Sequence, residues 1–506
     1  MSPTMATTTP LDLDGLTIGD VRDGALRGRP ITVLGFARSG IALARFLTDA
    51  GARVTVYDGR PAAELASGIE QLEGRDVRLL AGPEVDPAES WADAALVTTS
   101  PSINPDYPTT EPRIRRALQM LVAARAAGDP ETPALVSEPD LFLRLCPAAT
   151  IGVTGTKGKT TTSSLIAAIL AADPAHRSVL GGNIGIPLVE RLPELTPNDR
   201  VVIELSELQL PTLSHGTDVA VYTNVTSDHL DRHGSLEAYR RVKRRLAELV
   251  DPTGALVLNG DDPIVAGYGE GARARVTMYR LGAPGAGELG VVRGRIVTGA
   301  GVDVMAVDEL AIPGRHNVSN ALAAIAVGFH FGITPAAIRE AAAGFHGVEH
   351  RLEWVATIDG VRFINDSQGT QPDAVIAALR AFDPPIVLIA GGRDKGIDLS
   401  ALPPVVAERA AAAVLIGESG PRLEADFRAA GLARTERAAT LEESVRTADA
   451  IAREALAAGA PEPATVLLSP AAASFDMFVD YAARGDAFKE AIAAIAAARR
   501  QTGRDR

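Results

Sequence analysis

The sequence of 506 residues contains one cysteine, Cys146, and its aromatic residues make up only 4% of the chain. A single cysteine excludes an intrachain disulfide and a zinc site built from several cysteines. So few aromatic side chains disfavour a surface on which nucleobases stack. No run approaches the roughly 18 apolar residues of a membrane span, and the first residues lack the pattern of a signal peptide. These absences predict a soluble, cytoplasmic protein without a membrane partner.

Basic residues are also in the minority, with 50 Lys and Arg against 63 Asp and Glu and a formal net charge of −13. A nucleic-acid-binding domain needs a basic face, so we expect no nucleic-acid partner. The charge leaves room for a local basic pocket that binds phosphates. A hydrophobic content of 46% is ordinary for globular protein, and the length predicts about three domains.

Short apolar runs alternate with helical patterns along most of the chain, which predicts an α/β fold with buried parallel strands. Residues 1–29 are polar and are interpreted as a flexible arm. The predicted first domain covers residues 1–107, with strands in ITVLGF, ARVTVYD and DAALVTTS. The central domain covers 108–348, with strands in ATIGVTG, RVVIEL, DVAVYTNV and GALVLNG. The third domain covers 349–506, with strands in VRFIND, PIVLIAGG, AAVLIG and TVLLSP.

The sharpest local motif follows the predicted strand ATIGV and opens a predicted helix. Glycines in such a loop turn backbone N–H groups toward phosphate oxygens, and the helix N-terminus adds partial positive charge. Lys159 is expected to reach the outer phosphates, and the Thr160 hydroxyl to bind Mg²⁺. The spacing G-x-x-G-K-T is shorter than the usual form, because Val153 stands where the first glycine would be. The loop consists of Gly155, Thr156, Lys157, Gly158, Lys159, Thr160 and Thr161.

Two further positions are candidate metal ligands. Mg²⁺ beside phosphates takes oxygen ligands, and Glu204 ends the predicted strand RVVIEL. His229 lies in TNVTSDH, just after another predicted strand. Taken alone, Glu204 is as well explained as a solvated strand end, and His229 is more often structural.

The first domain has a glycine loop of its own, followed by an acid about twenty residues later. This arrangement is similar to a dinucleotide-binding fingerprint, but the middle glycine is missing. An NAD-dependent oxidoreductase is therefore an alternative that rests on this loop alone, and it leaves the phosphate loop unexplained. The residues concerned are Gly35, Ala37, Arg38, Ser39, Gly40 and Asp58.

An ordered set of motifs, covering the chain from about residue 29, resembles the Mur ligase family. The set comprises GVTGTKGKTTT, GGNIGIPL, VIELSELQL, TNVTSDHLDRHG, YRRVK, LNGDD, GRHNVSNALAA, HRLE, INDS, GGRDKG and LLSPAAASFD. The resemblance implies Rossmann-like N-terminal and C-terminal domains around a central ATPase domain with a mostly parallel sheet. It also implies a monomer.

The resemblance further implies an ATP-dependent amide-bond ligase of peptidoglycan precursor synthesis. ELSELQL, INDSQGTQPDA and GGRDKGIDL are most similar to members that add D-glutamate to UDP-N-acetylmuramoyl-L-alanine, forming an acyl phosphate and releasing ADP and phosphate. Gln368 departs from this group, which frequently has lysine there. The same nucleotide joined to L-glutamate or another amino acid is therefore an alternative. A folylpolyglutamate synthase-like ligase is a remote one.

The resemblance also assigns roles to single residues. It implies two Mg²⁺ sites, one held by Thr160 and Glu204, the other by His229 and by Lys243 carbamylated to N-carboxylysine. The implied catalytic residues are Lys159, Glu204, His229, Lys243 and Asp366. Besides the phosphate loop, the implied ATP contacts are Asn317, Asn320, Arg351 and Asp366. The implied nucleotide-substrate contacts are the first glycine loop, Asp58, Arg60, Asn183, Ser206 and Gln209. The implied amino-acid contacts are Thr370, Lys395, Ser474, Phe475 and Tyr481.

Overall fold

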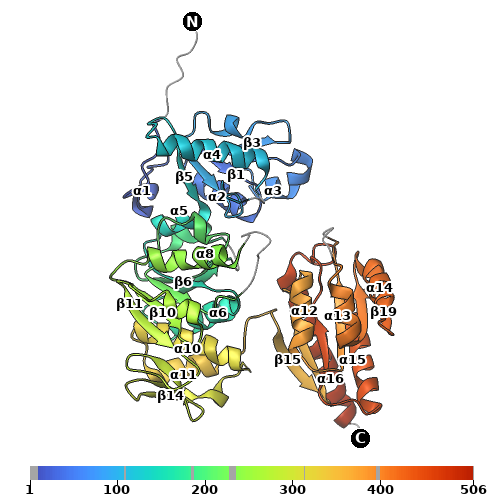
Figure 1. Ribbon diagram of the computed structural model, residues 1–506. Helices are drawn as coiled ribbons and strands as arrows, with labels where there is room; N and C mark the ends of the chain where they lie inside the picture. Colours follow the sequence, from blue (N-terminus) through green and yellow to red (C-terminus); the bar gives the residue numbers. More distant parts are fainter. Residues whose placement is uncertain are drawn as a thin grey trace. The chain divides into compact units, whose positions relative to one another are not determined.

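The computed structural model describes residues 9–107, 110–183, 187–226, 235–312, 314–394 and 399–504. The chain forms two compact units, Met1–Phe345 and His346–Arg506. Its strands form three sheets, of which the first two belong to the first unit (Figure 1). The predicted α/β class is therefore confirmed.

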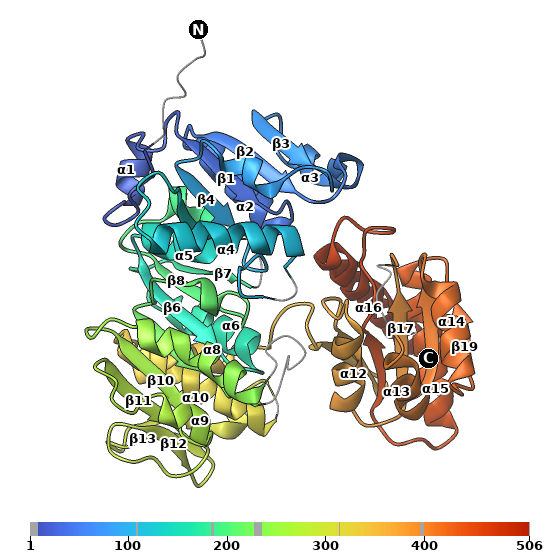
Figure 2. The same ribbon diagram turned by 45° about the horizontal axis from the view of Figure 1, so that its top comes forward.

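The first sheet has five parallel strands in the order β3-β2-β1-β4-β5. Helix α2 (Arg38–Asp49) buries Ile41, Leu43, Phe46 and Leu47, the spacing of one helix face turned to a core. Figure 2 shows α4 (Pro112–Ala126) running alongside this sheet. The strands are β1 (Pro30–Leu34), β2 (Arg53–Asp58), β3 (Val77–Ala81), β4 (Leu96–Thr99) and β5 (Ala134–Ser137). The short helices are η1 (Ala62–Leu65), α3 (Ala66–Glu70) and η2 (Pro87–Trp91).

The prediction of a flexible arm is wrong for residues 9–29. Helix α1 (Ile18–Arg22) begins at a capping box formed by Thr17 and Asp20. Four apolar side chains of this segment join the core of the first unit, and the Leu11 N–H donates to the Ala95 carbonyl. These core residues are Leu11, Ile18, Val21 and Leu26. The burial of these four apolar side chains outweighs the polar composition of the segment. Residues 1–8 lie outside the described part.

The first sheet extends past residue 107, where the sequence placed the end of the first domain. Strand β5 pairs with β4, and α4 precedes it, although both fall in the segment predicted as helix and then loop. The strand is only four residues long, ALVS, too short to show a period. The domain boundaries themselves stay a prediction.

The central sheet has nine strands in the order β14-β13-β12-β11-β10-β9-β6-β8-β7. It is mostly parallel, as predicted, and within the described residues only β12, β13 and β14 pair antiparallel. The strands are β6 (Ala149–Thr154), β7 (Ser178–Gly182), β8 (Arg200–Glu204), β9 (Val219–Tyr222), β10 (Ala255–Asn259), β11 (Arg275–Tyr279), β12 (Leu289–Val292), β13 (Arg295–Thr298) and β14 (Asp303–Ala306).

Helices α6 and α10 pack against each other and share one hydrophobic core with the central sheet. Most residues of α10 between Val318 and Gly328 are buried. An alanine-rich helix allows this close packing because its side chains are short. The helices of this part are α5 (Glu138–Leu145), α6 (Lys159–Leu170), η3 (Leu188–Glu194), η4 (Leu210–Thr212), α8 (Leu236–Leu249), α9 (Pro263–Gly267), η5 (Val307–Glu309), α10 (Arg315–His330) and α11 (Pro335–Ala343).

The second unit contains a six-stranded sheet in the order β15-β16-β20-β17-β18-β19, parallel except for β15. Helices α12, α13 and α14 pack into one core and α15 and α16 into another, so both faces are covered. The strands are β15 (Glu353–Ile358), β16 (Val361–Asn365), β17 (Ile386–Gly391), β18 (Ala410–Ile416), β19 (Thr435–Arg437) and β20 (Ala464–Leu468). The helices are α12 (Pro372–Ala381), α13 (Leu402–Arg409), α14 (Gly420–Ala429), α15 (Leu441–Ala457) and α16 (Tyr481–Arg504).

Among the described residues, no helix combines the length and the apolar character that crossing a membrane requires.

Candidate active site

The phosphate loop joins β6 to α6 and needs its two glycines. Gly155 and Gly158 have φ values of 146° and 86°, in the region that favours glycine. A Cβ on Gly155 would lie 2.0 Å from Thr223 Oγ1, and one on Gly158 would lie 2.5 Å from Asn320 Oδ1. The backbone is therefore pressed against its neighbours and opens toward the N-terminus of α6.

The loop is fixed by the segment that follows β9. The N–H of Thr156 donates to the Asn224 carbonyl at 2.7 Å, and the N–H of Lys157 donates to Asn224 Oδ1 at 3.0 Å. The Thr223 hydroxyl donates to the Lys157 carbonyl at 2.7 Å. Thr156 Oγ1 and the Tyr239 hydroxyl share a hydrogen bond of 3.0 Å. These bonds hold the loop in one conformation before any ligand binds.

Lys159 is the first residue of α6, and its ammonium lies over the loop. Its Nζ donates to the carbonyls of Gly155 at 3.1 Å and Thr156 at 2.9 Å. Thr160 is buried and Thr161 is half-buried on the same first turn. Asn320 reaches the loop from α10, and its Nδ2 donates to Asn317 Oδ1 at 3.1 Å. The structure thus brings the two predicted asparagines to the phosphate loop.

Glu204 ends β8, directly beside the strand that leads into the loop, in register with Val153. The Asn183 amide donates to Glu204 Oε1 at 2.8 Å. Glu204 Oε2 is buried and has no hydrogen-bond partner within the described part of the chain. Such an atom costs free energy unless a cation or donor meets it. A hard divalent cation such as Mg²⁺, which prefers carboxylate oxygen, fits this atom.

Lys243 projects from α8 and is fully buried. Its Nζ donates to Thr154 Oγ1 at 3.4 Å and lies 5.5 Å from the centre of the Tyr239 ring. Thr154 is the last residue of β6, so Lys243 lies at the base of the phosphate loop. From the sequence alone, a lysine on a helix is expected to be exposed to solvent. The structure instead buries Lys243. His229 lies outside the described residues.

The glycine loop of the first sheet joins β1 to α2 and has a different electrostatic character. Gly35 has a φ of 87°, and a Cβ on Gly40 would lie 1.8 Å from the Gly35 carbonyl oxygen. Asp58 ends the neighbouring strand β2 and accepts from the Phe36 N–H at 2.8 Å. Arg60 donates to both carboxylate oxygens of Asp58, at 3.0 and 2.8 Å.

Burial would raise the pKa of Asp58, but the hydrogen bonds from Arg60 and from the backbone hold it below its usual value. Asp58 is therefore a charged anchor for the loop and for Arg60. Its oxygens are engaged within the protein.

The remaining predicted nucleotide-substrate residues connect the first two sheets. Arg38, in the first turn of α2, donates to the Asn183 carbonyl at 3.3 Å. Gln209 Oε1 accepts from the N–H of Ser206 at 2.8 Å and from its hydroxyl at 3.0 Å. Ala37 caps α2 and Ser39 lies in its first turn. Asn183 thereby contacts both the first glycine loop and Glu204.

In the second unit, Asp366 follows β16 and is almost fully buried. Burial raises the pKa of Asp366 to about 6. The hydrogen bonds from Ser469 and Leu352 and the charge of Arg351 lower the pKa and offset part of this rise. The Ser469 hydroxyl donates to Asp366 Oδ2 at 2.6 Å, and the Leu352 N–H donates to Oδ1 at 3.2 Å. The structure thus places the predicted residues Arg351 and Asp366 close enough for their charges to interact.

Of the predicted amino-acid contacts, Thr370 follows strand β16, Ser474 and Phe475 follow strand β20, and Tyr481 begins helix α16. Thr370 follows Asp366 by four residues, and Ser474 is buried after β20. Phe475 is 65% exposed and Tyr481 is 38% exposed, so both aromatic rings are open to a ligand. Lys395 lies outside the described residues. The Gln368 amide donates to the Glu349 carbonyl at 3.3 Å, so this departure from the family pattern contacts backbone.

The sequence analysis missed Arg484, which is 1% exposed. Its guanidinium donates to the Ser367 hydroxyl at 3.0 Å and to the Ser367 carbonyl at 2.8 Å, and burial lowers its pKa to about 10. Ser367 in turn donates to the Tyr481 carbonyl at 2.7 Å. Arg484 therefore joins the Asp366 loop to the Tyr481 end of α16. The only sequence signal is its position three residues after Tyr481 on one helix.

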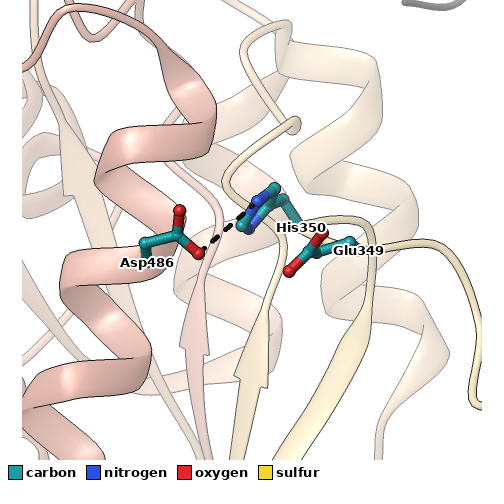
Figure 3. A group of neighbouring side chains, drawn as sticks. All are labelled: Glu349, His350 and Asp486. Atoms are coloured by element: carbon teal, nitrogen blue, oxygen red, sulfur yellow. Dashed lines mark ion pairs between the residues drawn. The ribbon is translucent and has the colours of Figure 1, made fainter.

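Among the described residues, Glu349, His350 and Asp486 form the one cluster of three His, Cys, Asp or Glu side chains with ligand atoms within 4.8 Å of one another (Figure 3). His350 Nε2 lies 3.9 Å from Asp486 Oδ1. The Lys489 ammonium hydrogen-bonds Glu349 and lies 3.1 Å from Asp486. A cation is therefore already supplied by the chain, and this cluster is an ion-pair network.

Two family models match the chain, the Mur ligase middle domain over residues 153–328 and the Mur ligase glutamate ligase domain over residues 350–472. Together they cover more than half of the sequence, and they contain the phosphate loop, Glu204 and Asp366. The chain belongs to the Mur ligase family. The resemblance seen in the sequence motifs is thereby confirmed.

Similar proteins agree with this assignment. UDP-N-acetylmuramoylalanine–D-glutamate ligase of Symbiobacterium thermophilum is 39% identical, over 92% of this chain and 97% of its own. The enzyme of the same name from Pelotomaculum thermopropionicum is 38% identical, over 92% and 98%. The crystal structure of UDP-N-acetylmuramate-alanine ligase from Thermotoga maritima matches 92% of this chain and 99% of its own, with 19% identity and a TM-score of 0.50. This last likeness shows the three-domain fold.

Proposed function

We propose that this Mur ligase is the ATP-dependent enzyme that joins D-glutamate to UDP-N-acetylmuramoyl-L-alanine in peptidoglycan precursor synthesis. The observation that carries the proposal is the near-complete alignment with ligases of that name. The phosphate loop and the open oxygen of Glu204 supply the chemistry that such a ligase needs. A carboxylate is a poor electrophile, so it must first be converted to an acyl phosphate.

The phosphate loop is proposed to bind the ATP phosphates. Its N–H groups and the N-terminus of α6 face the anion, and Lys159 would exchange the carbonyls of Gly155 and Thr156 for phosphate oxygens. Asn317 and Asn320 lie beside the loop, where the nucleoside would extend. Arg351 and Asp366 of the second unit are proposed as further nucleotide contacts. Most of the catalysis of phosphoryl transfer is positioning and charge neutralisation.

Glu204 and Thr160 are proposed to hold the first Mg²⁺. When bound, the ion neutralises phosphate charge as the acyl phosphate forms. The buried, unpartnered Oε2 of Glu204 supports this role, and Asn183 fixes the other oxygen of the same carboxylate. His229 and Lys243 are proposed for the second ion.

Lys243 is proposed to carry a carbamate. Its burial at the base of the loop supports a modified side chain, because a buried lysine ammonium is costly to desolvate. We expect Lys243→Ala to be inactive and to regain part of its activity when small carboxylates such as formate or acetate are added. Intact-mass measurement under bicarbonate tests the modification directly. Absence of both rescue and added mass would contradict the carbamate.

The first glycine loop, Asp58 and Arg60 are proposed to bind the UDP end, and Asn183, Ser206 and Gln209 the muramoyl end. Thr370, Lys395, Ser474, Phe475 and Tyr481 are proposed to bind the amino acid. Its amine then attacks the acyl phosphate, and the tetrahedral intermediate expels phosphate. We propose that the enzyme acts as a monomer.

Phosphate release from ATP with Mg²⁺, the nucleotide substrate and either D- or L-glutamate tests the function. Release with D-glutamate alone is the expected result. Release with L-glutamate alone would keep the fold and the mechanism but change the product. Gln368 is the reason to include that arm, because it places an amide where lysine is frequent. No release with either amino acid would contradict the proposed nucleotide substrate.

A further inference from the structure

Glu138 is a buried acid that the mechanism above does not use. It follows β5 directly and is the first residue of α5, where the chain passes from the first sheet toward the central sheet. Ser137 caps this helix, and the Glu138 side chain is 5% exposed. A glutamate with so little exposure is unusual unless it is paired or functional.

The carboxyl of Glu138 faces the central sheet and has few strong partners. The Val189 N–H on η3 donates to its Oε1 at the long distance of 3.4 Å. Burial raises the pKa of Glu138 to about 7, the positive charge of Arg38 on α2 opposes this, and Glu190 on η3 adds to it. Glu190 is itself paired with Arg45 of α2, at 3.3 Å. The carboxyl therefore has hydrogen-bonding capacity left to offer.

A small cavity lies against this carboxyl. Besides Glu138 and Gln209, its lining is mostly apolar and includes Phe142, Leu188, Ile203 and Leu205. The cavity has room for about one water molecule. A buried water needs at least two polar partners, and the carboxyl of Glu138 and the side chain of Gln209 supply them.

Gln209 is the residue through which this cavity reaches the proposed muramoyl site. Its Oε1 is already taken by the N–H and hydroxyl of Ser206. That leaves the Nε2 amide group to donate elsewhere. A water between this amide and Glu138 would fix the rotation of the Gln209 side chain, and with it the Ser206 hydroxyl.

We propose that Glu138 is a positioning residue for the nucleotide-substrate site, acting through one water on Gln209 and Ser206. The inference rests on the proposed function, which places Gln209 and Ser206 at the muramoyl part. Glu138 touches neither the substrate nor the reacting atoms. Its effect is therefore on the Michaelis constant for the nucleotide substrate, while the constants for ATP and glutamate stay as they are.

Three variants of the full chain separate hydrogen-bond position from charge. Glu138→Gln keeps an oxygen in place and removes the charge, so its KM for the nucleotide substrate is expected within about threefold of the wild type. Glu138→Asp keeps the charge but withdraws the oxygen, so that KM is expected to rise about tenfold. Glu138→Ala removes both and is expected to raise it at least as far. In all three, kcat and the other two KM values are expected within about twofold.

Asp140→Asn is the matched control, because Asp140 is also buried on α5 but bonds the Ser214 loop. It is expected to lower the melting temperature and leave the KM for the nucleotide unchanged. Calorimetric titration of UDP-N-acetylmuramoyl-L-alanine without ATP gives a second readout. If Glu138→Ala fails to fold, Glu138→Gln and Glu138→Asp still test the inference.

The outcomes distinguish this inference from the proposed function. A wild type that neither binds nor uses the nucleotide overturns the proposed function, and the inference with it. A wild type that uses it, with variants that lose only melting temperature, overturns the inference alone. Glu138→Asp resembling the wild type while Glu138→Gln is impaired would also overturn it, since charge and not oxygen position would then matter.

Discussion

The two sheets of the first unit contain the same arrangement with opposite electrostatic outcomes. In each, a strand runs into a glycine loop and a helix, and the neighbouring strand ends in an acid, Asp58 in the first sheet and Glu204 in the central one. Asp58 accepts two hydrogen bonds from the Arg60 side chain and one from Phe36. Glu204 accepts from Asn183 through one oxygen, and its other oxygen is buried without a partner in the described part.

This difference separates two uses of one backbone motif. The acid of the first sheet is neutralised by the chain itself, so it stabilises a preformed loop. The acid of the central sheet is left with an oxygen that the protein does not satisfy, which suits a cation brought in with phosphates. Of the two loops, only the phosphate loop of the central sheet leads into a helix that begins with lysine, Lys159 of α6. The backbone shape of such a loop therefore does not identify its ligand. The hydrogen-bond partners of the neighbouring acid do.

Lys159→Ala is expected to have the largest effect. It removes the cation that the central loop supplies to phosphates, and we expect kcat to fall by about a thousandfold or more. The side chain donates to the carbonyls of Gly155 and Thr156 in its own loop, so the melting temperature is expected to change by no more than a few degrees. Phosphate release and thermal unfolding measure the two effects.

Lys157→Ala is the comparison variant for this loop, because Lys157 is exposed and contributes mainly its backbone. Its loss of activity is expected to be at least tenfold smaller than that of Lys159→Ala. Near-normal turnover of Lys159→Ala would contradict the assignment of the loop to ATP.

Glu204→Gln is expected to show the next largest effect. The amide keeps the shape but replaces the open carboxylate oxygen, so the Mg²⁺ concentration for half-maximal rate is expected to rise about tenfold and kcat to fall about a hundredfold. Stability in the absence of Mg²⁺ is expected to be unchanged or higher, because a neutral amide replaces a buried carboxylate. Titration of activity with Mg²⁺ measures this, and an unchanged Mg²⁺ dependence would contradict the metal site.

Arg60→Ala tests the acid of the first sheet and is expected to have a smaller effect. It removes the partner of Asp58, and we expect the KM for the nucleotide substrate to rise about tenfold with kcat unchanged. Arg60 is about half exposed, so solvent screening limits the loss of unfolding free energy to about 1 kcal/mol. Equal losses in kcat and in all three KM values would place Arg60 in the chemistry instead.

Much of the site could be predicted from sequence because its motifs are local. The phosphate loop is seven consecutive residues between a strand and a helix, and the strand ends at Asp58, Glu204 and Asn365 follow from short apolar runs. In parallel sheets, consecutive strand ends meet at one edge, so local motifs become a shared site. The ordered motifs then supplied Lys243, whose burial no local pattern predicts.

The rest depends on contacts between distant segments. Arg484 is 117 residues from Ser367, and only the folded sheet places the two together. Strand β5 is too short to show a period, and the four buried apolar residues of 9–29 joined the core only by packing in the folded first unit. The polar composition of residues 9–29 predicted a flexible arm wrongly, because four apolar side chains of this segment pack into the core.

Asp366→Asn extends the comparison to a third acid through the pH dependence of unfolding. Burial raises the pKa of Asp366 to about 6 from 3.8, so the fold favours the neutral acid. The stability this provides is complete below about pH 4 and is lost as the pH rises through 6. Asparagine cannot ionise, so the variant is expected to gain on the order of 1 to 3 kcal/mol at pH 7.5 and nothing at pH 3.5. Asp58→Asn is expected to do the reverse and lose stability at pH 7.5, because its pKa is lowered in the fold. Thermal unfolding of both variants across this range measures the contrast, and a pH-independent difference for Asp366→Asn would show that folding does not shift the pKa of this carboxyl.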